Sequence, residues 1–442
     1  MKLDPGTARI GAAAQHAWRA ALSMVVLCLS ASAASTENLT PLADLGKSVF
    51  FDKTLSATGT QACGSCHAPE VGFSGPNQEF NKQGAYEGAV HGAFGKRKPQ
   101  TAAYVGSSPI LHIVMQAGVA TFVGGSFWDG RATGLRLQDP LAEQAQGPLV
   151  NPVEQALPDN ACVVERACAG DYASLFRWLN PEVCESPGLA ALRCEQGHIV
   201  SIDPSTRPVI AGGFDAIARA VDDYEESKEV CAYSSKYDAW KAGKAQLSAQ
   251  ELAGLAVFTG KGKCANCHVE AALAGGTGGT LFTDFTYDNL GVPRNPANPW
   301  YRQPANALGR NWVDLGLGGF LDTQPQWRQY AQANMGRMKV PTLRNVDKGP
   351  FAGFVKSYMH NGYFTSLENV VNFYNTRDVK PRCPDAFTPE SQAVARGCWP
   401  EAEVPETVNR KESGDLKLTA EEEGSLVAFM KTLSDGYSGA GQ

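Results

Sequence analysis

Residues 63–67 read Cys-Gly-Ser-Cys-His, and residues 264–268 read Cys-Ala-Asn-Cys-His. In a Cys-x-x-Cys-His motif the two thiols can both reach the vinyl groups of one porphyrin, and the next residue places its imidazole under the iron. A structural zinc site usually has its second cysteine pair about 15–20 residues further on, which is not the spacing here. We therefore predict two covalently bound haem c groups, attached through Cys63, Cys66, Cys264 and Cys267, with His67 and His268 as axial ligands.

A predicted amphipathic helix precedes each motif. Thr40 is suited to cap a helix over residues 41–52, whose first residue is proline. Ser248 and Glu251 form a capping-box pattern at the start of a helix over residues 248–258. Because the same arrangement occurs twice, the sequence predicts two similar domains.

The rest of the chain gives weaker signals. A third capping box, at Thr419, predicts a last helix over residues 419–433. Residues 273–325 are rich in Gly, Asn and Pro, which favours loops. Residues 155–245 have little periodicity, so we interpret them as an insertion plus an interdomain link. We find no strand-rich region.

The N-terminal 34 residues have the pattern of a secretory signal peptide. Basic residues precede a short apolar run over residues 20–29, and residues 31–33 read Ala-Ser-Ala, a small-residue cleavage pattern. This run is too short for a transmembrane anchor, and no later stretch is long enough to span a bilayer. We therefore predict a periplasmic protein. Its formal net charge of −6 argues against nucleic acid or an anionic membrane as partner.

The chain has 12 cysteines. Cys28 leaves with the signal peptide and four belong to the haem motifs. The seven that remain predict up to three disulfides and one free thiol, because an exported protein can keep disulfides. We expect Cys383 to pair with Cys398, since they stand alone in the last quarter of the chain. The sequence leaves open the pairing of Cys162, Cys168, Cys184, Cys194 and Cys231.

Several further motifs lie between and after the haem motifs. They are Phe-Trp-Asp-Gly-Arg-Ala at 127–132, Glu-Gln-Ala-Gln-Gly-Pro at 143–148, Asn-Pro-Val-Glu at 151–154, Pro-Thr-Leu-Arg-Asn-Val at 341–346, Tyr-Met-His-Asn-Gly at 358–362 and Leu-Glu-Asn-Val-Val-Asn-Phe-Tyr at 367–374. Together they resemble the bacterial di-haem cytochrome c peroxidase and MauG family over roughly residues 40–435.

This resemblance implies a mainly α fold of two cytochrome-c-like haem domains whose haems face a shared interface. We place the N-terminal domain at residues 35–240, with the cysteine-rich insertion, and the C-terminal domain at residues 241–442. The resemblance also implies different roles for the haems. The haem on His67 would react with peroxide, and the haem on His268 would be six-coordinate and transfer electrons.

The sixth ligand of the second haem separates the subfamilies. It falls fourteen residues after His360, where ordinary peroxidases of the family have methionine and this chain has Tyr374, as in MauG. A phenolate is a hard anion that stabilises the higher oxidation states of iron. We therefore predict Tyr374 as the ligand, with Met359 and Met338 as its rivals.

The resemblance also assigns residues around the first haem. Members that need reductive activation carry a displaceable histidine where this chain has Gln83, so we predict an open iron at His67 and keep His91 and His112 as substitutes. Glu154 matches the distal acid/base that moves a proton between the oxygens of peroxide. Three more residues complete the predicted site: Gln144, Pro148 and, nearby, His360.

Two further features follow from the resemblance. Trp128 would lie between the haems and relay charge, since an indole is readily oxidised. A calcium ion is implied between the domains, with Val355 and Ser357 at its carbonyl positions. Lys98 replaces the asparagine expected at that ion, which counts against calcium here.

The function implied is a peroxide-dependent oxidoreductase. Hydrogen peroxide would generate a high-valent two-haem state that oxidises an aromatic residue on a partner protein. The stretches 127–148 and 291–301 are most similar to MbnH-type members, which convert a tryptophan of a partner, here an MbnP-like copper- or metal-binding protein, to kynurenine. The alternatives are a cytochrome c peroxidase that takes electrons from a small redox protein, disfavoured by Tyr374, and a non-enzymatic electron carrier, disfavoured by Glu154 and Gln83.

Overall fold

The computed structural model describes Met1, residues 38–116, 118–190, 192, 194, 201–270 and 279–439. The predicted signal peptide lies outside the described residues, apart from Met1. Residues Leu39–Gln442 form one compact unit. None of the described helices has the length and apolar character needed to span a membrane. The division into two haem domains near residue 240 stays a prediction.

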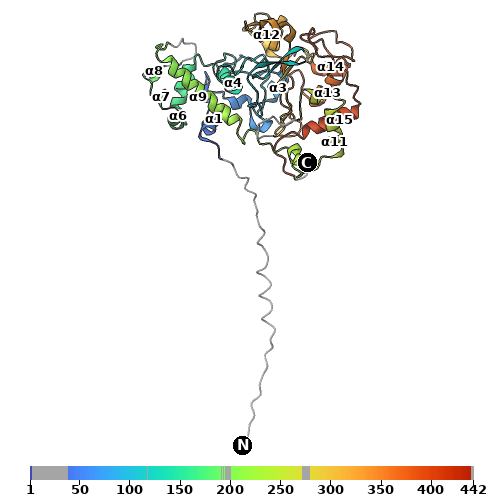
Figure 1. The fold of residues 1–442 in the computed structure, drawn as a ribbon, viewed down its shortest axis with the longest axis horizontal. Coiled ribbons are helices and arrows are strands. Elements are labelled where there is room, and N and C mark those ends of the chain that lie inside the picture. The colour runs from blue at the N-terminus through green and yellow to red at the C-terminus, as the bar shows by residue number, and fades with distance from the viewer. Residues whose placement is uncertain are drawn as a thin grey trace. The chain divides into compact units, whose positions relative to one another are not determined.

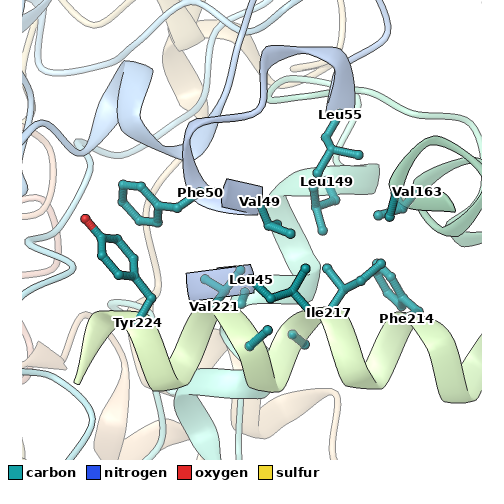
Figure 2. Close-up of a cluster of buried hydrophobic side chains, with 14 of the residues drawn as sticks. Leu45, Val49, Phe50, Leu55, Leu149, Val163, Phe214, Ile217, Val221 and Tyr224 are labelled. Atoms are coloured by element: carbon teal, nitrogen blue, oxygen red, sulfur yellow. The ribbon is translucent and has the colours of Figure 1, made fainter. Parts of the chain in front are cut away.

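The helix that precedes the first haem motif is α1, Pro41–Phe51, and the structure confirms its predicted cap: Thr40 Oγ1 accepts a hydrogen bond from Ala43 N. α1 packs along α9, Arg207–Glu225 (Figure 1). Figure 2 shows how Leu45, Val49 and Phe50 of α1 and residues of α9 contribute to one buried cluster. Each such side chain stabilises the fold by roughly 1.5–3 kcal/mol through removal from water.

A second helix pair repeats this arrangement beside the second haem motif. α11, Ala249–Thr259, has the predicted capping box of Ser248 and Glu251, and it packs along α15, Ala420–Lys431, capped by Thr419. Each pair has a glycine at the point where its two helices cross. A Cβ on Gly46 would lie 1.7 Å from the carbonyl oxygen of Ala220, and one on Gly254 would lie 1.9 Å from that of Ser425. Each pair therefore requires glycine where the backbones touch.

Replacing Gly46 by alanine is expected to destabilise the fold by roughly 1–3 kcal/mol, because the new methyl group overlaps the backbone of α9 and the helices must separate. Gly212→Ala in α9 is the control, since a Cβ there meets nothing within 4 Å. It should be neutral or stabilising. Denaturant unfolding of the haem-loaded protein measures both, and equal stability of the two variants would contradict the helix-crossing argument.

The cysteine-rich segment is helical, although its sequence showed little periodicity. The disulfides are Cys162–Cys194, Cys168–Cys184 and Cys383–Cys398, so the predicted last pair is confirmed. Among the described cysteines outside the haem motifs, Cys231 is the unpaired one. The remaining α-helices are α2 Cys63–Cys66, α3 Gln78–Gln83, α4 Pro140–Val150, α5 Asn160–Ala169, α6 Ala173–Leu179, α7 Pro181–Cys184, α8 Pro187–Ala190, α10 Lys236–Lys241, α12 Gly316–Asp322, α13 Leu367–Thr376 and α14 Glu390–Arg396.

Strands are few in the described part of the chain, as predicted. β1, His112–Gln116, pairs antiparallel with β2, Val119–Val123, with His112 opposite Val123. β3, Tyr287–Asp288, pairs antiparallel with β4, Met338–Lys339. α12 lies in the region expected to be loops. Its Gly-rich sequence carries little helix propensity, and its Leu317 and Leu321 are fully buried, so packing stabilises it.

Candidate functional site

The first Cys-x-x-Cys-His motif forms the single turn α2, and His67 follows as its C-cap residue. His67 Nδ1 lies 3.2 Å from the carbonyl oxygen of Phe73. A hydrogen bond from Nδ1 fixes the ring and leaves Nε2 unprotonated for a metal. Burial lowers the pKa of His67, which favours the same neutral form.

The second motif has the same local design. Residues Cys264–Asn266 form a turn of 3₁₀-helix, η3, and His268 Nδ1 lies 2.8 Å from the carbonyl oxygen of Phe282. Burial lowers the pKa of His268 as well. Two imidazoles, each positioned by a backbone carbonyl beyond its own motif, are arranged as axial ligands.

Each motif faces its own cavity. Cys63, Cys66 and His67 line a cavity of about 440 Å³. Cys264, Cys267 and His268 line one of about 230 Å³. Two thiols and one imidazole on one cavity wall are the donor set of a haem attached by thioether bonds. The residues present therefore fit one haem at each motif.

The two cavities share part of their walls. Trp128 and Lys98 line both of them, as do residues 339–342 of the strand β4 and the loop after it. Trp128 is 7% exposed, and its Nε1 donates a hydrogen bond to the carbonyl oxygen of Lys98 at 3.2 Å. This bond holds the indole ring in the shared wall. The structure thus places Trp128 between the two cavities.

Glu154 lines the cavity of His67 together with Gln144 and Pro148 of α4. Asn151, which ends α4, donates from Nδ2 to Glu154 Oε2 at 2.9 Å. Burial raises the pKa of Glu154, while Arg131 and the bond from Asn151 oppose the shift. A partly buried carboxyl group with a raised pKa that lines a cavity is suited to take up and return a proton.

The three residues considered for the far side of the first iron lie elsewhere. Gln83 ends α3, and its backbone oxygen accepts a bond from Asn295. His91 is exposed and contacts Glu87, and His112 is exposed on β1. Among the described residues that line this cavity, His67 is the single histidine.

Tyr374 lines the cavity of His268 from α13, whose N-cap is Ser366. Burial raises the pKa of Tyr374, because a phenolate would be desolvated there. A cation in the cavity reverses this preference, since a metal ion favours the deprotonated ligand. Met338 and Met359 line the same cavity. The identity of the sixth ligand therefore stays a prediction.

His360 was expected to lie near the peroxide pocket of His67. It lines the neighbouring cavity of His268 and does not line that of His67. Its ring lies 6.4 Å from that of Trp128, and its Nε2 lies 3.7 Å from Glu403 Oε2. His360 is thus a neighbour of the shared wall. Its contact with Trp128 depends on the tertiary fold, which the motif alone does not fix.

At the predicted calcium position, the side chain of Asn81 contacts the backbone carbonyl of Val355 and the hydroxyl of Ser357. The oxygen of Val355 accepts a hydrogen bond from Asn81 Nδ2 at 2.9 Å, and Ser357 Oγ lies 3.5 Å from Asn81 Oδ1. An N–H donor that faces a carbonyl competes with a cation for it. Calcium at Val355 and Ser357 stays a prediction.

Sequence reasoning missed the buried lysines of the site. Lys339 Nζ donates to Ser108 Oγ and to the oxygen of Gly124, both at 3.1 Å, and burial lowers its pKa to about 7. Burial also lowers the pKa of Lys98, to about 8. Both lysines lie in the shared wall of the two cavities. The sole sequence signal was Lys98 in place of the family asparagine.

Comparisons with known proteins agree with this geometry. The sequence model of the family described as di-haem cytochrome c peroxidase matches residues 40–246. The chain is 34% identical over 397 residues to the methylamine utilization protein MauG of Paracoccus denitrificans, covering 89% of this chain and 88% of that protein. The similarity to this MauG protein therefore extends over most of both chains.

Solved structures extend the comparison to the fold. The diheme peroxidase BthA from Burkholderia thailandensis superposes with a TM-score of 0.69 at 29% identity, covering 90% of this chain and 87% of that one. A MauG-like protein associated with microbial copper homeostasis has the same fold, with a TM-score of 0.57 at 22% identity over 90% of this chain and 91% of that one.

The predicted family and the mainly α class, with its two cytochrome-c-like domains, are confirmed by these matches. Relatives of this kind are haem-dependent oxidoreductases with peroxidase-like activity. The chain belongs to the di-haem cytochrome c peroxidase and MauG family.

Proposed function

We propose that this protein is a periplasmic MauG-type oxidase that uses hydrogen peroxide to oxidise an aromatic residue, most simply a tryptophan converted to kynurenine, on a partner protein. The observation that carries the proposal is the shared wall. Trp128 borders both the cavity equipped with Glu154 and the cavity equipped with Tyr374. In this proposal the haems, attached through Cys63, Cys66, Cys264 and Cys267, supply the peroxide site and hold the two oxidising equivalents.

Glu154 performs the proton chemistry in this proposal. Cleavage of the O–O bond of peroxide requires a proton to move from one oxygen to the other, so that water can leave. Glu154 is held by Asn151, and its raised pKa matches it to both steps, uptake and return. Gln144 and Pro148 restrict the space beside it.

Trp128 and Tyr374 serve charge transfer rather than bond cleavage. Trp128 is fixed in the shared wall by its bond to Lys98. The position of its ring shortens the path for electrons between the two centres. Tyr374 supplies a hard anionic oxygen that favours an oxidised second centre. A methionine in its place would favour the reduced state instead.

The direct test is to incubate the haem-loaded protein with peroxide and candidate partner proteins from the same periplasm, and to examine the partners by mass spectrometry. We expect the mass change of tryptophan-to-kynurenine conversion on one partner. Trp128→Phe should slow the conversion at least tenfold, because the relay between the centres is lost. A folded cognate partner that keeps its mass would contradict the proposal.

A second candidate function is reduction of peroxide with electrons from a small redox protein. Met338 and Met359 line the cavity of His268 and would give it a high potential as ligands. Rapid peroxide turnover with reduced cytochrome c, without change to any partner protein, would favour this function.

A further inference from the structure

Three aromatic side chains form a cluster on the outer side of the cavity of His67. Trp300 and Tyr301 belong to the 3₁₀-helix η4, Pro299–Arg302, and Trp300 lines the cavity. The ring of Trp312 lies 6.0 Å from that of Trp300 and 6.1 Å from that of Tyr301, edge to face in both cases. Trp312 is partly exposed. The rings thus make a contact path from the cavity to the surface.

The indole N–H of Trp300 is buried, and it meets no acceptor among the described residues. An oxidised indole readily loses this proton to a nearby base. Since no described residue accepts this proton, Trp300 can pass charge to the ring of Trp312 without a proton acceptor supplied by the chain.

Tyr301 has the opposite environment. It is 7% exposed, and the carboxylate of Glu403 acts on its phenol as a neighbouring negative charge. Glu403 Oε1 also accepts a bond from Asp314 N at 3.0 Å, which fixes the carboxylate. Burial, followed by the charge of Glu403, raises the pKa of Tyr301. The phenol is therefore neutral, and its proton has to leave when its electron leaves.

We propose that Trp300, Trp312 and Tyr301 form a second electron-transfer route, between the cavity of His67 and the surface at Trp312, in which Glu403 is the proton acceptor of Tyr301. The route rests on the peroxide-driven function above. Hydrogen peroxide oxidises the haem pair, and one electron then leaves Tyr301 and passes through Trp312 and Trp300 to reduce that pair. The phenolic O–H bond breaks, and its proton moves to Glu403. An external reductant at Trp312 returns the electron, and Glu403 returns the proton.

This route is separate from the one through Trp128, but the two come close. Glu403 Oε2 lies 3.7 Å from His360 Nε2, and the His360 ring lies 6.4 Å from Trp128. The route offers oxidising equivalents an exit when no partner protein is bound.

The test adds peroxide to the haem-loaded full-length protein without partner or reductant. Freeze-quench EPR detects a tyrosyl radical, and mass spectrometry detects oxidised Trp312. Tyr301→Phe should abolish the tyrosyl signal. Trp300→Phe should lower oxidation of both residues at least tenfold, and Glu403→Gln should lower the tyrosyl signal at least tenfold. Trp327→Phe is the matched control, because Trp327 packs on Phe122 and Phe320 and borders neither cavity.

Optical spectra of the haems distinguish a failure of the electron-transfer route from a failure of the proposed function. If peroxide oxidises the haems but Trp312 is oxidised no more than the exposed Trp178, the route is overturned and the proposed function stands. If the haems do not respond to peroxide, the proposed function fails. A photogenerated ruthenium tris(bipyridine) oxidant then tests the route: a tyrosyl radical that requires Tyr301 and Glu403 supports it, and none overturns it.

Discussion

Replacing Glu154 by glutamine is expected to lower the rate at which the haem-loaded protein reacts with peroxide by about 10²–10⁴-fold, the usual contribution of a general acid/base group. Glutamine keeps the shape of the side chain and an oxygen that can accept the bond from Asn151. The glutamine amide cannot take up and return a proton near neutral pH as a carboxyl group can. Stopped-flow absorption of the haem bands measures the rate.

Glu70→Gln is the matched control for this prediction. Glu70 lies three residues after His67 but is exposed and lines neither cavity. Its replacement changes the net charge by the same amount and should leave the rate unchanged. A full rate in Glu154→Gln, or an equal loss in both variants, would remove Glu154 from the proton chemistry.

Replacing Tyr374 by methionine is expected to raise the reduction potential of the second haem by a few tenths of a volt, within the range of about 0.8 V that axial ligands span. The physical reason is the exchange of an anionic oxygen, which stabilises ferric iron, for a neutral thioether. The variant should also lose oxidation of the partner protein. Redox titration followed by optical spectroscopy measures the shift.

The rival ligands supply the controls. Met338→Leu and Met359→Leu remove the two rival thioethers, both of which line the same cavity. If Tyr374 is the ligand, both variants keep the potential of the parent protein. If one of these variants shifts the reduction potential while Tyr374→Met leaves it unchanged, that methionine is the ligand of the iron. This result would favour the peroxidase function.

The elements that were predictable carry their own local signals. α1, α11 and α15 begin with capping residues that bond to their own first turn, so the sequence alone predicts where they start. α9 was missed because Gly212 and Gly213 lower its intrinsic helix propensity. Gly213 is required by contact with Val183 and Val164, and the packing of α9 on α1 stabilises the helix.

In the site, too, some residues have a local sequence signal and others depend on the packing of distant segments. The haem motifs are contiguous, so their ligands could be assigned by inspection. The cavity wall brings together segments far apart in the chain, and Lys339, His360 and Trp300 acquire their neighbours only when those segments pack. A buried lysine looks like a solvated one in sequence. No feature of the sequence therefore indicates that Lys339 lies in the cavity wall.

The proposed function requires an unequal pair of haem irons, with an open iron at His67 and a second iron closed by Tyr374. Low-temperature EPR of the resting ferric protein tests it most directly, before and after one equivalent of peroxide without reductant. We expect one high-spin and one low-spin ferric signal, both of which disappear with peroxide. Two low-spin signals that peroxide leaves unchanged would contradict it.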